Sequence, residues 1–317
     1  MHGVIVKPEH GSIEWLQARH RDEEGMPVIS ASDAACVHGE HRYKSLYQFC
    51  QEKMADDVQV TETNEAMERG NRLEPMLIDW VGDKIGRKLR TPQKMYVYKE
   101  PGVSLIATLD AVDWTVDIEQ GLLAPAVVEI KTTNRVFDPE APLPAMWFWQ
   151  GVQQAICANV NKITWGVFDS TLTLHIVEQV VTSDAKRDHI DQCRNVTSHL
   201  MTGDIPNEWA QTIEDLRALE EDPGTTTEID SVETQLRELI EVQAEARELK
   251  KREDDLKVQI GVALGTASVG TINGKPAVTW KTQSRSGFDN KRFAADHPDM
   301  AEQYTTTSSF RVMRFPK

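Results

Sequence analysis

Cysteine is scarce in this 317-residue chain: its four cysteines, Cys36, Cys50, Cys157 and Cys193, form no C-x-x-C pair. Neither a zinc site nor a disulfide framework is indicated, and we expect small buried thiols in a reducing compartment. The sequence also has no apolar run near the ~20 residues of a membrane-spanning helix. Its N-terminus lacks a basic stretch followed by an apolar one. These absences predict a cytoplasmic protein without a membrane partner.

Basic residues are outnumbered, with 35 Lys and Arg against 50 Asp and Glu and a net charge of −15. This balance argues against a general nucleic-acid coating protein, because nonspecific affinity for DNA comes largely from neutralisation of phosphates by Lys and Arg. Any contact with DNA must therefore be local. A concave site whose carboxylates are neutralised by metal ions, flanked by a few arginines, meets this requirement.

Apolar periodicity predicts an α/β fold in which helices cover a mixed sheet. Helical spacing occurs over residues 12–19, 45–54, 64–85, 145–158 and 184–201, with a further helix start at 30–33. Strand-type runs occur over residues 95–98, 103–109, 111–118, 126–130, 163–168 and 172–180. Pro75 falls inside one helical pattern and predicts that this helix kinks or restarts there.

Composition changes after an acidic segment with Pro223 and Gly224, which predicts a domain boundary. We expect a core domain over 1–220, a linker over 221–228, a long helix with a coiled-coil-type pattern over 229–265, and a small basic module containing β structure over 266–317. Residues 275–317 hold eight Lys or Arg and four acids, which is 8 − 4 = +4. This tail is interpreted as the solvated face of a small module, with a DNA-facing or partner-facing surface as the alternative.

A spaced set of charged residues ends in the triplet Glu129-Ile130-Lys131, which closes a short apolar run. Strand alternation puts Glu129 and Lys131 on one face and Ile130 on the other. Asp110 ends another apolar run, and an adjacent strand of hairpin type can bring its carboxylate beside Glu129. Charged groups at such positions are costly unless something binds them, which suggests a site.

The two carboxylates and the carbonyl of Ile130 are the oxygen ligands that Mg²⁺ or Mn²⁺ prefers, with positions left for water and a phosphate oxygen. Lys131 would hold the attacking water and stabilise the extra negative charge on phosphorus. The pattern thus favours hydrolysis of a phosphodiester. A surface salt bridge is the alternative, since an equivalent triplet at 248–250 lies in a charged helical stretch.

Several ordered motifs over residues 12–180 resemble the lambda exonuclease and YqaJ-like phage recombinase family of the PD-(D/E)xK nuclease superfamily. They are Trp15-x-x-x-Arg19, Ser30-Ala31-Ser32-Asp33, Met67-Glu68-Arg69-Gly70-x-x-x-Glu74, Asp110 with Glu129-Ile130-Lys131, and Gln150-Gly151-Val152-Gln153. The chain departs from the family at Leu109, where a proline usually precedes the aspartate. Since that proline binds no metal, we expect little loss. The resemblance implies a restriction-endonuclease-like core.

The resemblance also implies roles for particular residues. Asp110 and Glu129 match the metal ligands, Lys131 the catalytic lysine, and Glu74 a helix carboxylate that supports a second metal. The implied cofactor is Mg²⁺ or Mn²⁺, with two ions in each site.

Arg19 and Ser32 match positions that grip the 5′-phosphate of the digested strand, and a guanidinium fork suits this dianion. Gln150 or Gln153 matches the family's catalytic helix glutamine, and the register between them stays open. Arg19 as a surface arginine, Ser32 as a helix cap and Glu74 as a charge near a helix start are the alternatives.

The activity that the resemblance implies is 5′-to-3′ digestion of one strand of linear double-stranded DNA, which leaves a 3′ single strand for a recombinase or annealing protein. It further implies a ring-like trimer in a bacterial host cytoplasm, encoded by a phage or prophage. Three alternatives are an endonuclease on the same core, an iron-sulfur nuclease, and a DNA-end binding scaffold with a vestigial site. The absence of clustered cysteines after the Glu129 strand argues against the iron-sulfur type.

Overall fold

The structure is a computed structural model that describes residues 1–9, 11–55, 64–113, 127–219, 224–306 and 312–315. The chain divides into two compact units, Met1–Leu219 and Glu220–Lys317. Its strands are β1 His2–Val6, β2 Ile29–Ser30, β3 Leu89–Arg90, β4 Lys94–Glu100, β5 Val103–Thr108, β6 Ala111–Asp113, β7 Val127–Thr132, β8 Lys162–Phe168, β9 Leu174–Val180, β10 Val269–Ile272 and β11 Lys275–Thr279. Its α-helices are α1 Ile13–Ala18, α2 Leu46–Met54, α3 Glu65–Ile85, α4 Ala145–Cys157, α5 Ser183–Thr202, α6 Ile213–Ala218, α7 Glu233–Leu264, α8 Asn290–Asp296 and α9 Pro298–Tyr304.

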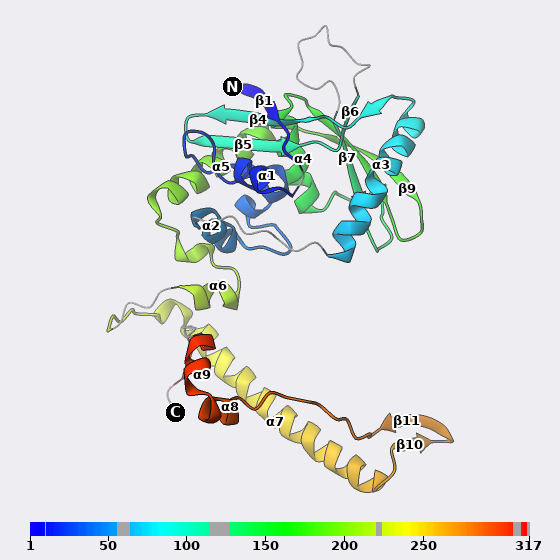
Figure 1. Cartoon of the computed structure of the whole chain (residues 1–317), viewed down its shortest axis with the longest axis vertical. Coiled ribbons are helices and arrows are strands. Elements are labelled where there is room, and N and C mark those ends of the chain that lie inside the picture. Colours follow the sequence, from blue (N-terminus) through cyan, green and yellow to red (C-terminus); the bar gives the residue numbers. More distant parts are fainter. Residues whose placement is uncertain (10, 56–63, 114–126, 220–223, 307–311, 316–317) are drawn as a thin grey trace. The chain divides into compact units, whose positions relative to one another are not determined.

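The N-terminal unit is built on two mixed sheets (Figure 1). One sheet has the order β1-β4-β5-β2, in which only the β5–β2 pair is parallel. The other has the order β3-β6-β7-β8-β9, in which only the β7–β8 pair is parallel. Helices pack on these sheets, so the predicted α/β class with a mixed sheet flanked by helices is confirmed.

Apolar side chains cover both faces of β7. Val127 belongs to a large cluster that β5 and β8 form with α4 and α5. Val128 and Ile130 belong to a smaller cluster with Leu77 of α3. Because side chains alternate along a strand, Glu129 and Lys131 project to the same face as Val127, toward α4. The site therefore lies on the α4 side of β7.

The helix does not restart at Pro75, since α3 runs as one helix from Glu65 to Ile85. Proline removes the amide that would bond to the carbonyl four residues earlier, at Asn71. Asn71 is exposed, so water can satisfy that carbonyl. Packing of Leu77 and Val81, which are fully buried, holds the helix after the proline.

Some elements differ from the expected pattern. The segment expected to begin a helix at 30–33 forms two short 3₁₀ turns, Ala31–Asp33 and Cys36–His38. The strand expected over 111–118 is seen as β6, and the rest of it lies outside the described residues. Strand β1 was not predicted because its pairing with β4 joins residues 88 to 96 positions apart.

The C-terminal unit contains the long helix α7 and a β10–β11 hairpin. Asn273 and Gly274, both with positive φ, form the hairpin turn, as the dipeptide Asn-Gly favours. The short helices α8 and α9 were not predicted; α8 is capped by Asp289, and α9 starts at Pro298. Among the helices of the described ranges, none combines the length and hydropathy of a membrane span.

Candidate active site

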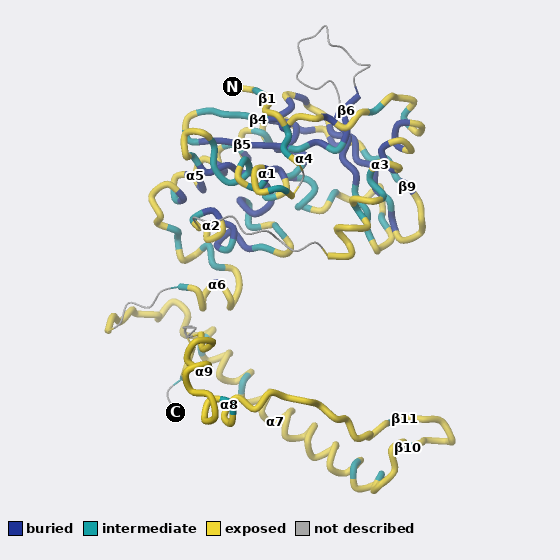
Figure 2. The backbone as a smooth tube through the Cα atoms, in the orientation of Figure 1, coloured by how far each residue is buried: buried dark blue, intermediate teal, exposed yellow. Residues whose placement is uncertain are grey.

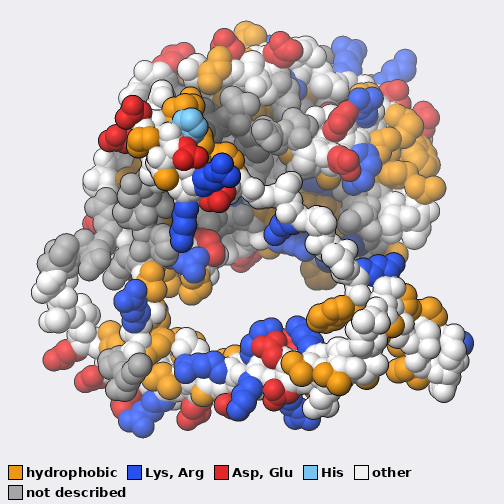
Figure 3. Space-filling model, turned by 60° about the horizontal axis from the view of Figure 1, so that its bottom comes forward, with side chains coloured by type: hydrophobic (Ala, Val, Ile, Leu, Met, Phe, Trp, Pro, Cys, Tyr) orange, Lys and Arg blue, Asp and Glu red, His pale blue; other side chains and the backbone are white. Residues whose placement is uncertain are grey.

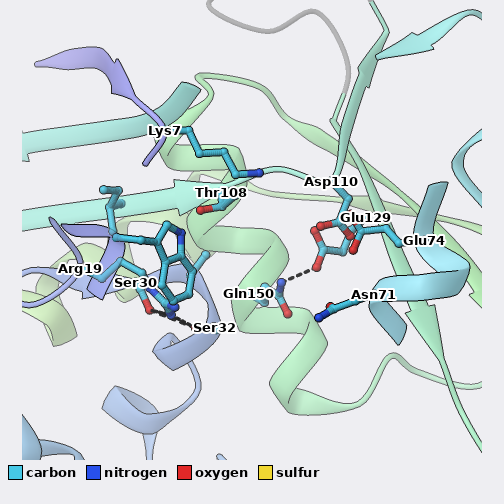
Figure 4. A pocket seen from close by; sticks show the side chains of 13 residues that line it. Lys7, Arg19, Ser30, Ser32, Asn71, Glu74, Thr108, Asp110, Glu129 and Gln150 are labelled. Carbon is cyan, nitrogen blue, oxygen red and sulfur yellow. Dashed lines mark hydrogen bonds between the residues drawn. The ribbon is translucent and has the colours of Figure 1, made fainter. Parts of the chain in front are cut away.

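A pocket of about 440 Å³ opens where the chain passes from β5 of the first sheet to β6 of the second. Asp110 lies at this crossing (Figure 4). Side chains from both sheets and from three helices line the pocket: Lys7, Trp15, Arg19, Ser30, Ala31, Ser32, Asn71, Glu74, Ile106, Thr108, Asp110, Glu129 and Gln150.

The carboxylate of Asp110 accepts a backbone hydrogen bond from β7 that a neighbouring strand would otherwise accept. Pairing of β6 with β7 ends at Ala111 and Val128. Beyond that pair, the amide of Ile130 donates to Oδ2 of Asp110 at 2.8 Å. The end of the β6–β7 ladder thus fixes Asp110 beside Glu129. The prediction that Ile130 supplies a carbonyl ligand remains a prediction, because the observed contact uses its amide.

Glu129 is nearly buried, at 3% exposure, and accepts hydrogen bonds on both oxygens. Its Oε1 accepts from Nζ of Lys131 at 2.7 Å and from the amide of Gln150. Its Oε2 accepts from Nε2 of Gln154 at 2.6 Å. Three donors therefore hold this carboxylate in one orientation, and Oε2 keeps a lone pair for a further ligand.

The carboxylates of Asp110, Glu129 and Glu74 lie close together in the pocket (Figure 4), so their negative charges repel one another. Burial and the charge of Glu129 raise the pKa of Asp110 well above its usual range. Burial and Glu129 likewise raise the pKa of Glu74. Burial alone would lower the pKa of Lys131, but the carboxylates of Glu129 and Asp110 outweigh it and raise that pKa. Lys131 is therefore a fixed cation next to acids that resist carrying their charges together.

The glutamines of α4 separate into two groups. Gln150 lines the pocket, whereas Gln153 is fully buried and donates to the carbonyls of Ile29 at 2.8 Å and Ile106 at 3.0 Å. Of the two glutamines that the sequence left open, Gln150 is the one that lines the pocket, because three residues along a helix turn the side chain to another neighbour. Sequence reasoning missed Gln154, which lies one helical turn after Gln150 and contacts the same carboxylate.

Arg19 occupies the far end of the pocket from the acids (Figure 4). Its Nη2 donates to Oγ of Ser30 at 2.7 Å and to Oγ of Ser32, so the two predicted phosphate-binding residues are in contact. Its guanidinium carbon lies 4.0 Å from the ring centroid of Trp15. Oδ2 of Asp33 lies 3.9 Å from Nη2 and accepts from Ser30 at 2.6 Å. The guanidinium is thus oriented by the indole and the hydroxyls.

Sequence reasoning missed two further pocket residues, Lys7 and Asn71. Lys7 follows β1, and only the pairing of β1 with β4 brings it to the pocket. Asn71 lies one turn before Glu74 on α3, so helical spacing from Glu74 would have found it.

The donor set fits a hard divalent cation. Asp110, Glu129 and Glu74 carry the oxygen atoms that would hold such an ion, and a bound cation would relieve their mutual repulsion. Within the described ranges, no three His, Cys, Asp or Glu side chains are close enough to form a complete metal cluster by themselves. Mg²⁺ is commonly held by one or two carboxylates together with waters and substrate phosphates, so an incomplete protein cluster is compatible with it.

Comparison with known proteins adds a family match. Residues 14–161 match the YqaJ-like viral recombinase domain. No curated protein sequence matches the chain. Similar solved structures include an alkaline exonuclease from Laribacter hongkongensis, with 16% identity, 61% of this chain and 94% of that chain covered, and a TM-score of 0.46. A putative exonuclease from Eubacterium rectale has 10% identity, 72% and 99% coverage and a TM-score of 0.46. A phage related exonuclease from Haemophilus somnus has 13% identity, 56% and 96% coverage and a TM-score of 0.41. At such scores these likenesses establish no function.

Proposed function

We propose that the protein is a metal-dependent exonuclease of linear double-stranded DNA, because residues 14–161 match the YqaJ-like viral recombinase domain. It removes nucleotides from the 5′ end of one strand and leaves a 3′ single strand for an annealing or recombinase protein. We place this activity in a bacterial host cytoplasm. The supporting observation is one pocket with three acids and Lys131 near one end and Arg19 at the other.

The carboxylates of Asp110, Glu129 and Glu74 would hold one or two Mg²⁺ or Mn²⁺ ions. A bound cation supplies charge neutralisation at the scissile phosphate and lowers the pKa of water. Glu129 is kept in place by Lys131, Gln150 and Gln154, so its geometry is fixed before substrate arrives.

Lys131 acts as a cation in this proposal. The carboxylates of Glu129 and Asp110 stabilise the ammonium and raise the pKa of Lys131, which favours this role over that of a general base. The ammonium orients the attacking water and stabilises the negative charge that develops on phosphorus. Gln150 assists by restraining the same carboxylate oxygen that Lys131 contacts.

Arg19 and Ser32 recognise the 5′-phosphate in this proposal. A guanidinium that is already stacked on Trp15 and bonded to serine hydroxyls loses little freedom on binding a phosphate. A terminal phosphate bound there would set the distance to the acids at the other end of the pocket. This arrangement favours digestion from an end over cleavage within a strand.

The decisive assay uses linear duplex labelled at the 5′ or the 3′ end, with and without Mg²⁺. We expect metal-dependent release of the 5′ label as mononucleotide and persistence of the 3′ label in single strands. Lys131→Ala and Asp110→Asn should each lower the rate by about 10²-fold or more. Lys162→Ala is the matched control, since its ammonium pairs with Glu178 on the surface. Wild-type activity in the Lys131 and Asp110 variants would refute the proposal.

Specificity for the end is tested with Arg19→Ala. We expect a larger loss on 5′-phosphorylated ends than on 5′-hydroxyl ends. Arg21→Ala is the control, because that guanidinium donates to the carbonyls of Gly25 and Lys53 and does not line the pocket. Equal losses on both kinds of end would remove the proposed role of Arg19. Nicking of closed circular DNA would instead indicate an endonuclease.

The ring-like trimer implied by the sequence also remains a proposal. A trimer that threads the duplex through its centre would reconcile the net charge of −15 with a local DNA site. Sedimentation with and without duplex DNA tests it, and a monomeric complex with DNA would contradict it.

A further inference from the structure

The long helix α7 carries an apolar seam that its own unit leaves open. From Leu239 to Ala263, side chains recur at alternating spacings of three and four residues, as in the a and d positions of a coiled coil. Seven of these eight positions are apolar, and the eighth is Glu253. We call this set the α7 seam: Leu239, Val242, Ala246, Leu249, Glu253, Leu256, Ile260 and Ala263.

None of the described side chains of α7 is buried, as Figure 2 shows by the exposed colour along the helix. The large apolar residues of the seam are 38% to 66% exposed, with Leu239 and Leu249 at the two limits. Apolar side chains lie among charged ones on the surface of this unit (Figure 3). The half-buried Leu236 and Gln243 lie beside the seam and do not belong to it.

A helix in water depends on burial of one face for most of its stability. The described contacts along α7 are ion pairs within the helix, such as Arg237 with Glu233 and Lys250 with Asp254. Ion pairs of this exposed kind contribute little. A continuous apolar seam over 25 residues therefore indicates a partner helix.

The charged residues in and beside the α7 seam indicate which partner helix is complementary to it. We propose that the α7 seam pairs in antiparallel orientation with α7 of a second copy of this chain. In this register Leu239 faces Leu256 of the second copy, and Ala246 faces its Leu249. At the centre of the interface the small Ala246 thus faces the large Leu249, which suits close packing.

The antiparallel register also places Glu245, beside the seam, against Arg252 of the second copy, twice in each pair. In addition, Glu253 faces Val242 of the second copy. A parallel pair would set Glu253 against the same residue of its partner and Arg252 against Lys257, so like charges would meet. The attraction between Glu245 and Lys250 in that form offsets only the second of these repulsions. The distribution of charge therefore favours the antiparallel form over the parallel one.

The proposal is independent of the proposed exonuclease activity, because α7 lies outside the residues that match the recombinase domain. Substitutions at two equally exposed positions of α7 distinguish the loss of helix pairing from a general effect of a surface substitution. Leu249 on the seam is 66% exposed, and Val258 off the seam is 65% exposed. In an unpaired helix, a lysine at either position would have the same small effect.

Sedimentation equilibrium of the full-length protein measures self-association. We expect Leu249→Lys to weaken it by about 30-fold or more, since it buries a charge at the centre of the seam. Val258→Lys should change it by about 2-fold or less. Glu253→Leu should strengthen it, which keeps the test meaningful if a lysine variant misfolds. Equal behaviour of the Leu249 and Val258 variants would overturn the proposal.

Orientation is tested by disulfide crosslinking, for which the background is low because the native cysteines are buried. A mixture of Leu239→Cys chains and Leu256→Cys chains should crosslink, whereas Leu239→Cys chains alone should not. The reverse result would indicate a parallel pair and overturn the antiparallel assignment. If wild type shows no association through α7, the seam binds another protein and the proposal fails.

Discussion

Acidification should destabilise the N-terminal unit through a buried histidine pair behind the pocket. Nε2 of Gln153 donates to the carbonyls of Ile29 and Ile106, so its Oε1 must accept. His189 lies 3.0 Å from that oxygen through Nε2 and 2.9 Å from Nε2 of His38 through Nδ1. When Nε2 of His38 carries its proton, this chain of bonds requires a neutral His189 whose Nδ1 accepts from His38. A second proton on His189 would face the donor of His38.

The direction and size of this change in the free energy of unfolding follow from the pKa of His189. Burial, and then His38, lower the pKa of His189 from 6.5 to about 3. In the unfolded chain it returns to about 6.5, so the unfolded state binds more protons at pH values between these two. The stability contributed by the neutral imidazole is therefore complete above pH 6.5 and is lost progressively as the pH falls. At pH 5 the loss is about 1.5 pKa units × 1.36 kcal/mol, or about 2 kcal/mol.

Urea unfolding of the full-length protein at pH 7.5 and 5.0 provides the measurement. The free energy of unfolding of the N-terminal unit should fall by about 2 kcal/mol more in wild type than in His189→Gln, which cannot gain a proton. His199→Gln, on the same helix near its exposed end, is the control and should retain the wild-type dependence. If wild type and His189→Gln lose stability in parallel between these pH values, the assignment of a neutral buried His189 is refuted.

Three further predictions concern the site and its support. Mg²⁺ at 100 times its dissociation constant should stabilise wild type by about 2.7 kcal/mol, which raises Tm by roughly 5–10 °C in a thermal shift assay. Asp110→Asn should lose this gain, and an equal shift in both proteins would contradict metal binding by Asp110. Gln154→Leu should cost about 1–2 kcal/mol in urea unfolding and slow digestion, because Glu129 loses a charge-assisted hydrogen bond; unchanged values would show that Gln154 does not position it. Gly151→Ala should destabilise the protein by about 2 kcal/mol, although alanine has the better helix propensity, because the added Cβ would lie 2.1 Å from Oε1 of Gln179. A variant that melts at a higher temperature than wild type would contradict this packing.

Local patterns were sufficient for much of the core. Alternation along 126–130 predicted that Glu129 and Lys131 share a face, because the side-chain period of a strand is fixed by its backbone. Helical spacing likewise predicted a helix that carries Glu74. The resemblance to the recombinase family, and not local spacing, implied that Arg19 and Ser32 bind one phosphate, and the structure places the two side chains in contact.

Contacts between distant segments could not be predicted in this way. The register of Gln150, Gln153 and Gln154 depends on how α4 is rotated against two sheets, and the sequence around them is rich in glutamine in any register. Lys7 reaches the pocket only through pairing of β1 with β4. The buried pair of His38 and His189 joins residues 151 positions apart.

The sequence by itself determined the candidate residues at the strand ends, Asp110, Glu129 and Lys131, because charged side chains there are recognisable from local period and polarity alone. Tertiary structure decided how they are held. The pairing of β6 with β7 ends at Ala111 and Val128, so the carboxylate of Asp110 accepts a hydrogen bond from the amide of Ile130. The orientation of α4 then selects which amides hold Glu129. Both outcomes depend on where separate elements pack, and packing is a property of the whole fold.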